Sequence, residues 1–125
     1  MEMSNDGAYV LTGEETNKLT LWEEGTKLWD KGNFLAGLYG IDISADGSNI
    51  TAVDRRNVYF FNKESGTNIW NENFPSQEMS TVSISPDGKY IAAGTFDGNV
   101  YVFLTSDKEN AVSYTHLTLP TMFEV

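Results

Sequence analysis

Short apolar segments alternate with polar turns along most of the chain. Stretches such as AYVLTG, KLTLW, SNITAV and NVYFF carry apolar or β-branched residues at alternate positions, between turns rich in Gly, Asp, Asn and Ser. Alternation with a period of two residues is typical of half-buried β-strands. The pattern predicts an all-β protein built from short antiparallel strands.

One sequence unit recurs three times along the chain. The tetrad Ser-x-Asp-Gly begins at Ser4, Ser44 and Ser85, so its spacings are 40 and 41 residues. Trp29 and Trp70 each stand 15 residues before the next tetrad. A period of roughly 40 residues with four strands per unit indicates a β-propeller, in which sheets called blades stack around an axis. We therefore predict a fragment of a β-propeller with four-stranded antiparallel blades, one complete and two partial.

Each tetrad is predicted to form a tight turn between two strands. The Asp-Gly pairs supply the positive φ that such a turn requires. We expect turns between strands at 38–43 and 49–53, and between strands at 80–84 and 89–94. The carboxylates beside glycine are also of the kind that binds calcium, but the turn explains the same residues and is the favoured interpretation. The pairs are Asp6-Gly7, Asp46-Gly47 and Asp87-Gly88, with Asp97-Gly98 as a fourth.

Two segments resemble known propeller families. The run SPDGKYIAAGTFDGNVYVF at 85–103 resembles the central hairpin of WD-repeat and related prokaryotic propellers, and Trp22-Glu23 stands where WD repeats place Trp-Asp. No Gly-His pair precedes a blade, so the His-containing hydrogen-bond network of WD repeats cannot form here as in that family, although Asp97 can occupy its turn position. The resemblance covers about residues 1–104 and implies a propeller.

A looser resemblance links the second unit to quinoprotein propellers. Asn62, Ser65, Gly66 and Trp70 are similar to the Asp-x-x-Thr-Gly-Lys-x-x-Trp docking motif of pyrroloquinoline-quinone-type propellers, with Thr67 in place of Lys. The first unit keeps only Gly25 and Trp29 of this motif. The resemblance implies that each such Trp docks one blade on another.

The repeat divides the chain into a partial blade at 1–30, a complete blade at 38–71, a partial blade at 80–110 and a tail at 111–125. Met1 aligns with Ile41 and Val82, in the middle of a strand. We therefore expect Met1 to be an internal methionine of a longer protein, with further blades before it.

The tail departs from the repeat, because it offers no further strand ending in Trp. Its run VSYTHLTLPT at 112–121 resembles the translation of the transposase mosaic end and adapter used in sequencing libraries, including those made from metagenomic DNA. The following residues fit the adapter's index and a stop codon after Val125. We interpret residues 112–125 as untrimmed adapter with no biological role.

Charge and composition argue against several function classes. The 18 acidic and 8 basic residues give a net charge of -10, which repels phosphate backbones and anionic lipid headgroups and argues against nucleic-acid and membrane partners. The chain has no Cys, and its one His, His116, lies in the tail. Thiolate chemistry, Ser-His triads and most transition-metal sites are therefore excluded from the natural part. We predict no cofactor and no catalytic residue.

Two function classes remain, and the favoured one is a non-enzymatic scaffold whose loops bind a protein partner. Arg55-Arg56, the only adjacent basic pair, are candidate contacts to that partner. Trp22, Trp29 and Trp70 are predicted to pack between blades rather than to line a ligand groove. The alternative is part of a quinoprotein dehydrogenase, which would require cofactor contacts from several blades and a calcium site that the sequence does not identify.

Overall fold

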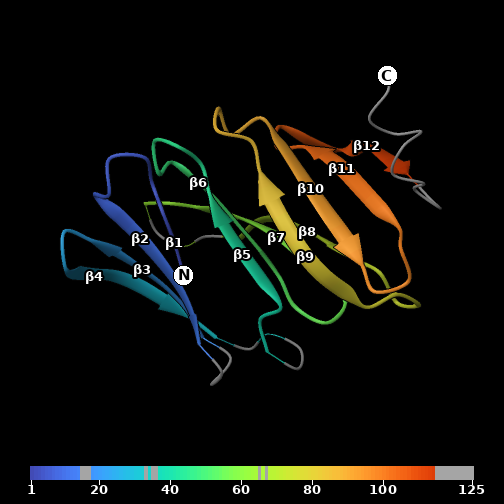
Figure 1. Ribbon diagram of the computed structural model, residues 1–125, viewed down its shortest axis with the longest axis horizontal. Coiled ribbons are helices and arrows are strands. Elements are labelled where there is room, and N and C mark those ends of the chain that lie inside the picture. Colours follow the sequence, from blue (N-terminus) through green and yellow to red (C-terminus); the bar gives the residue numbers. More distant parts are fainter. Residues whose placement is uncertain (15–17, 33, 35–36, 65, 67, 115–125) are drawn as a thin grey trace.

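Three antiparallel four-stranded sheets follow one another along the chain and lie side by side in space (Figure 1). This computed structural model describes residues 1–14, 18–32, 34, 37–64, 66 and 68–114. The first sheet contains β1 (Glu2–Met3), β2 (Tyr9–Glu14), β3 (Lys18–Glu23) and β4 (Thr26–Lys31). The second contains β5 (Gly40–Ile43), β6 (Asn49–Val53), β7 (Asn57–Asn62) and β8 (Asn68–Asn73). The third contains β9 (Met79–Ile84), β10 (Tyr90–Thr95), β11 (Val100–Leu104) and β12 (Asp107–Tyr114).

Each sheet is a meander, in which every strand pairs with the next one along the chain. The tetrads form the turns β1–β2, β5–β6 and β9–β10, and Gly7, Gly47 and Gly88 all have positive φ, between 74° and 80°. Only glycine adopts this backbone without strain from a Cβ atom. The all-β prediction and the two predicted tetrad turns are confirmed.

The second sheet buries both of its faces. Ile50, Ala52 and Phe61 pack in a core shared with the first sheet, which contributes Leu11, Leu19 and Leu21. Val53, Val58 and Phe60 pack in a second core with the third sheet, which contributes Ile91 and Phe103. A single four-stranded sheet with two apolar faces must be covered on both sides, and stacking supplies both covers. These two cores hold the three sheets together as blades.

The two end units are the segments that were predicted to be partial blades. Each has four strands, although β1 has only two residues. β12 begins at Asp107 and ends at Tyr114, so it includes the first residues of the segment interpreted as adapter. Val112 pairs with Val102 and Tyr114 with Val100. Backbone pairing to an edge strand requires an extended chain and no particular side chain, which is why such a segment can complete the sheet. Residues 115–125, including His116, lie outside the described residues.

Among the residues that the structure describes, no helix is long and apolar enough to cross a membrane.

Candidate functional site

The tetrad carboxylates accept hydrogen bonds from groups in their own turns. The hydroxyls of Ser4, Ser44 and Ser85 donate to the Asp carboxylate two residues later, at 2.9, 3.0 and 2.6 Å. The same carboxylates accept the backbone N–H groups of Ala8, Ser48 and Lys89 at 2.9 to 3.0 Å. These hydrogen bonds favour the charged form and lower the pKa of all three acids, that of Asp46 to about 2, chiefly through the Ser48 hydroxyl.

No calcium site emerges from these acids. Within the described ranges, no group of three or more His, Cys, Asp or Glu side chains is placed to hold a metal ion. Asp6, Asp46 and Asp87 belong to separate turns, and they do not form such a group in the described part of the chain.

Asp97 forms a fourth turn of the same kind at the other end of the third sheet. It accepts a short hydrogen bond from the Thr95 hydroxyl, which in turn accepts the N–H of Asn99 at 3.0 Å. Thr95-Phe96-Asp97-Gly98 is therefore the tetrad with Thr in place of Ser. Asp97 was predicted to lie in a turn, but the replacement of Ser by Thr in this tetrad was not predicted, although the residues alone show it.

Asp54 is a structural acid that the sequence analysis missed. It is fully buried at the β6–β7 turn, where it accepts the N–H groups of Arg56 and Asn57 at 3.0 and 2.8 Å and the Tyr59 hydroxyl at 2.7 Å. Burial and this carboxylate raise the pKa of Tyr59. An Asp directly after an apolar strand is a known turn signal, but nothing local indicates its burial. Asp54 fixes the turn that carries Arg55 and Arg56.

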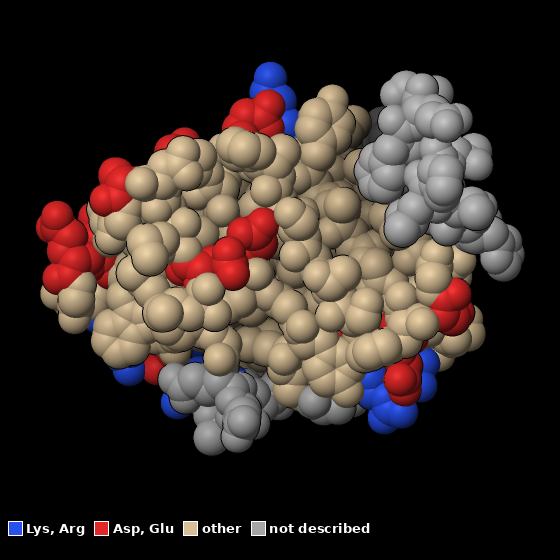
Figure 2. All heavy atoms as spheres, in the orientation of Figure 1, with Lys and Arg blue, Asp and Glu red and all other residues tan. Residues whose placement is uncertain are grey.

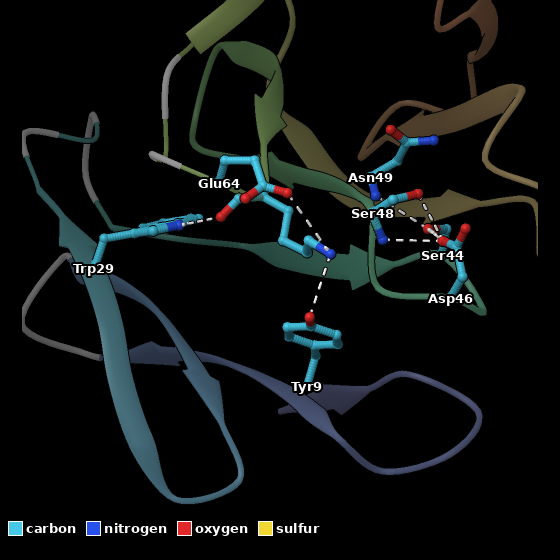
Figure 3. A network of polar contacts seen from close by, with 8 residues as sticks. Tyr9, Trp29, Ser44, Asp46, Ser48, Asn49 and Glu64 are labelled. Atoms are coloured by element: carbon cyan, nitrogen blue, oxygen red, sulfur yellow. Dashed lines mark hydrogen bonds and ion pairs between the residues drawn. The ribbon is translucent and has the colours of Figure 1, made fainter.

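Trp29 and Trp70 occupy equivalent places between blades. The Trp29 indole N–H donates to the carbonyl of Lys63 in the second blade at 2.7 Å (Figure 3), and the Trp70 indole donates to the carbonyl of Thr105 in the third at 3.0 Å. Trp29 also lies on Gly66, where a Cβ atom would come within 2.8 Å of the indole ring. Ser65 and Thr67, the other residues of the docking-like motif, lie outside the described residues.

Trp22 has a different role from the other two tryptophans. Its indole N–H donates to the Thr12 hydroxyl at 3.1 Å, within the first sheet. Trp22 pairs with Val10 across the β2–β3 ladder. Its described contacts thus lie within the first sheet, and its packing between blades stays a prediction.

The tetrad turns of successive blades also contact one another. The N–H of Asn5 donates to the carbonyl of Ala45 at 2.8 Å, and the N–H of Ala45 donates to the carbonyl of Pro86 at 3.0 Å. The residue five positions after the tetrad Ser contacts the tetrad glycine of the next blade in both cases, although its type differs. Tyr9 lies against Gly47, and Asn49 lies against Gly88 and donates to its carbonyl at 3.2 Å. We call this recurring set of contacts the blade seam.

Each of the two seams has a further polar contact. At the first, Lys63 donates to the Tyr9 hydroxyl at 3.3 Å and lies 4.6 Å from the centre of its ring (Figure 3). At the second, the Asp42 carboxylate on β5 accepts the N–H of Ile84 on β9 at 2.7 Å. These contacts join the tetrad ends of successive blades.

At that other end, four side chains, each from a different loop, form one surface. Tyr39 and Phe96 make an edge-to-face ring contact at 6.1 Å, and Arg55 pairs with Glu78 at 2.6 Å. Backbone bonds join the loops, because Phe96 N–H donates to the Glu78 carbonyl and Met79 N–H to the Arg55 carbonyl. Phe96 is 69% exposed and Tyr39 39%. We call these four residues, Tyr39, Arg55, Glu78 and Phe96, the loop surface.

The two candidate arginines are held within the chain. Arg55 is paired with Glu78, which raises the pKa of its guanidinium, and Arg56 donates to the carbonyl of Pro75 at 2.5 Å. Each guanidinium therefore already has a hydrogen-bond acceptor within the chain. The structure places both at the loop surface or directly beside it.

A hollow of about 630 Å³ adjoins the loop surface along the inner strands. Its lining includes Glu2, Gly13, Leu38, Tyr39, Ile41 and Val82. Figure 2 shows acidic atoms gathered near the middle of this view, over β1 and β5, with basic atoms mostly at its margins. Among the described residues, the lining combines glycine backbone and apolar side chains with the polar residues Glu2 and Thr81.

Comparison with known proteins identifies the repeat. Residues 72–103 match the family model "WD domain, G-beta repeat". The chain is 32% identical over 118 residues to autophagy-related protein 16 of Arabidopsis thaliana, covering 89% of this chain and 23% of that protein.

Solved structures share the arrangement of the sheets. The structure of U3-55K superposes with a TM-score of 0.79 at 15% identity, and the WD40 repeats of RRP9 with 0.77 at 14%. Each match covers 92% of this chain and 36% of the other. The β-propeller domain of Cps50 (Swd1) from Myceliophthora thermophila superposes with a TM-score of 0.74 at 11% identity, over 90% and 36% of the two chains. The three sheets therefore have the fold of β-propeller blades, and the third of them contains most of the segment that matches the WD-repeat model.

Proposed function

We propose that this propeller is a non-enzymatic scaffold that binds a protein partner at the loop surface. The observation that carries the proposal is the exposed Tyr39–Phe96 ring pair, held on loops from different blades. Exposed aromatic residues on rigidly positioned loops are typical of protein-binding surfaces. The match to a WD-repeat model and the similarity to autophagy-related protein 16 support a scaffold.

The two ends of the blades differ in which side chains are exposed to a partner. At the tetrad end, the polar side chains close their own turns and the turns contact one another along the seam. At the loop end, two aromatic rings remain exposed beside a neutralised Arg55–Glu78 pair. A surface of this kind suits an apolar side chain of the partner, placed against the rings. The net charge of -10 additionally favours a partner with basic residues around that contact.

The quinoprotein alternative gains no supporting observation. Gly66 and Trp29, part of the motif that suggested it, contact one another at the first seam and have a structural role. We therefore propose no redox activity for this chain.

A site-specific photocrosslinker tests the scaffold proposal in the host cell. With the crosslinking amino acid at Phe96, we expect covalent adducts with one defined protein, and we expect the Tyr39→Ala change to reduce them. The matched control carries the crosslinker at Leu28, which is 41% exposed on the outer strand β4. Equal adducts from both positions, or none from Phe96, would contradict the proposal.

A further inference from the structure

The Arg55–Glu78 ion pair of the loop surface uses only one of the two carboxylate oxygens. Arg55 Nε donates to Glu78 Oε1 at 2.7 Å, and Arg55 Nη2 lies 2.6 Å from the same oxygen. Among the described residues, no hydrogen bond or ion pair reaches Glu78 Oε2. The Glu78 side chain is 41% exposed, so this second oxygen can accept a hydrogen bond from a partner.

The two aromatic rings of the loop surface stand almost at a right angle to each other. The Tyr39 and Phe96 rings are inclined at 79°, and both side chains are exposed. Phe96 N–H donates to the Glu78 carbonyl at 3.0 Å, so these two residues lie side by side. The face of an aromatic ring is negatively polarised and attracts a cation within about 6 Å of the ring centre. The rings and the carboxylate therefore both favour a positively charged group.

The charges of the surrounding turns also favour a cation. These turns carry three acids, Asp54, Glu78 and Asp97, and two bases, Arg55 and Arg56. Asp97 directly follows Phe96 and is exposed, and the whole chain has a net charge of -10. A negative field attracts basic segments and repels acidic ones. A partner carboxylate directed at Arg55 is therefore disfavoured relative to a basic side chain.

We propose that the loop surface binds a lysine side chain of the partner, with its ammonium group on Glu78 Oε2 and its apolar stem against the Tyr39 and Phe96 rings. Because the loop surface is the proposed partner site, this contact rests on that proposed function and specifies its chemistry. An ammonium group needs a single acceptor oxygen, whereas an arginine guanidinium is matched to both oxygens of a carboxylate. Since Arg55 already occupies Oε1, the surface suits lysine better than arginine.

Crosslink mapping in the host cell first identifies the segment of the partner that binds here. The crosslinking amino acid replaces Ser76, an exposed residue two positions before Glu78 that is not part of the proposed contact. Mass spectrometry of the adduct should show a lysine close to the crosslinked position. A segment without lysine would overturn the lysine contact and leave the scaffold proposal intact. The absence of a defined adduct from both Ser76 and Phe96 would overturn both.

A synthetic peptide of that segment then tests the lysine against the full 125-residue chain. Fluorescence anisotropy compares it with a peptide in which norleucine replaces the lysine, which keeps the apolar stem and removes the charge. The affinity should fall about tenfold or more, because a charge-assisted hydrogen bond and a cation–π contact are lost. A peptide with arginine at this position should also bind more weakly. Equal or tighter binding of either altered peptide would overturn the proposal.

Three variants of the chain test which residues distinguish lysine from norleucine. Glu78→Gln removes the acceptor charge and should bind the two peptides alike, and Phe96→Leu loses the ring face and should reduce the preference for lysine. The matched control Glu24→Gln removes the same charge at the exposed β3–β4 turn and should bind as the unchanged chain does. Unchanged circular dichroism spectra show that the variants fold. A full preference for lysine in Glu78→Gln, or its loss in Glu24→Gln, would overturn the proposal.

Discussion

At the scale of single residues, alanine substitutions at Gly25 and Gly66 distinguish the free-energy cost of backbone strain from the cost of a steric clash between blades. They are equivalent positions with φ of +86° and +69°, but a Cβ at Gly66 would overlap the Trp29 ring, whereas a Cβ at Gly25 would meet nothing within 4 Å. Gly25→Ala should destabilise the chain by about 1 kcal/mol, the cost of a left-handed alanine. Gly66→Ala should cost about 2 to 4 kcal/mol, because overpacking is added.

Urea unfolding of the two glycine variants measures this difference. Equal losses of free energy for Gly25→Ala and Gly66→Ala would show that the Trp29 contact does not hold the first two blades together.

The tetrad acids make stability depend on pH. The pKa of Asp46 is lowered from 3.8 to about 2 by the hydroxyl and N–H of Ser48 and the hydroxyl of Ser44. Because this pKa is lower in the folded than in the unfolded state, the stabilisation is fully present above about pH 4 and is lost as the pH falls towards 2. Asp6 and Asp87 shift in the same direction.

The Asp46→Asn variant should therefore lose less stability on acidification than the unchanged chain. The measurement is the urea midpoint between about pH 5 and pH 2. An identical pH dependence in the two proteins would contradict the assigned hydrogen bonds, since the variant has no charge to lose at this turn.

At the scale of strands and blades, Trp70 tests the second seam. Its half-buried ring lies 5.6 Å from Phe60 and 5.4 Å from Phe103, centre to centre, and its N–H donates to Thr105. Trp70→Ala should cost about 3 kcal/mol of unfolding free energy, the lower end for loss of a large core ring. Trp70→Phe keeps an apolar ring but loses the donor and should cost about 1 kcal/mol.

Chemical denaturation compares these two Trp70 variants. A loss below about 0.5 kcal/mol for Trp70→Ala, as for surface positions, would show that this ring does not join the blades.

The strands and tetrad turns were predictable because their signals are local. Asp-Gly at a fixed spacing specifies positive φ at Gly47 and Gly88 wherever the rest of the chain lies. The roles of Asp42 and Asp54 were not predictable in this way. Asp42 reaches a strand about one repeat later, and the burial of Asp54 depends on the packing around its turn.

The loop surface was predicted only in part for the same reason. Arg55 and Arg56 stood out as a basic pair, but their partners Glu78 and Pro75 come from a loop about twenty residues away. The ring contact joins Tyr39 and Phe96, which lie in different units of the repeat. Such contacts follow from how blades stack and not from any one segment.

At the scale of the whole molecule, the tail offers a test of its own. We propose that residues 111–125 contribute nothing specific, although β12 pairs through Tyr114 with β11. A chain ending at Asn110 should unfold with a free energy within about 0.5 kcal/mol of the full chain. A cooperative transition that only the full chain shows would contradict the adapter interpretation of this segment.

Hydrogen exchange at the seam amides tests most directly whether the three sheets stack as propeller blades. The N–H groups of Asn5 and Ala45 lie in turns and have acceptors on the next blade, the carbonyls of Ala45 and Pro86. We predict that both amides exchange as slowly as those of β6, because they are released only when a seam opens. Exchange of both at the rate of an unstructured peptide, while β6 stays protected, would contradict the stacking of the blades.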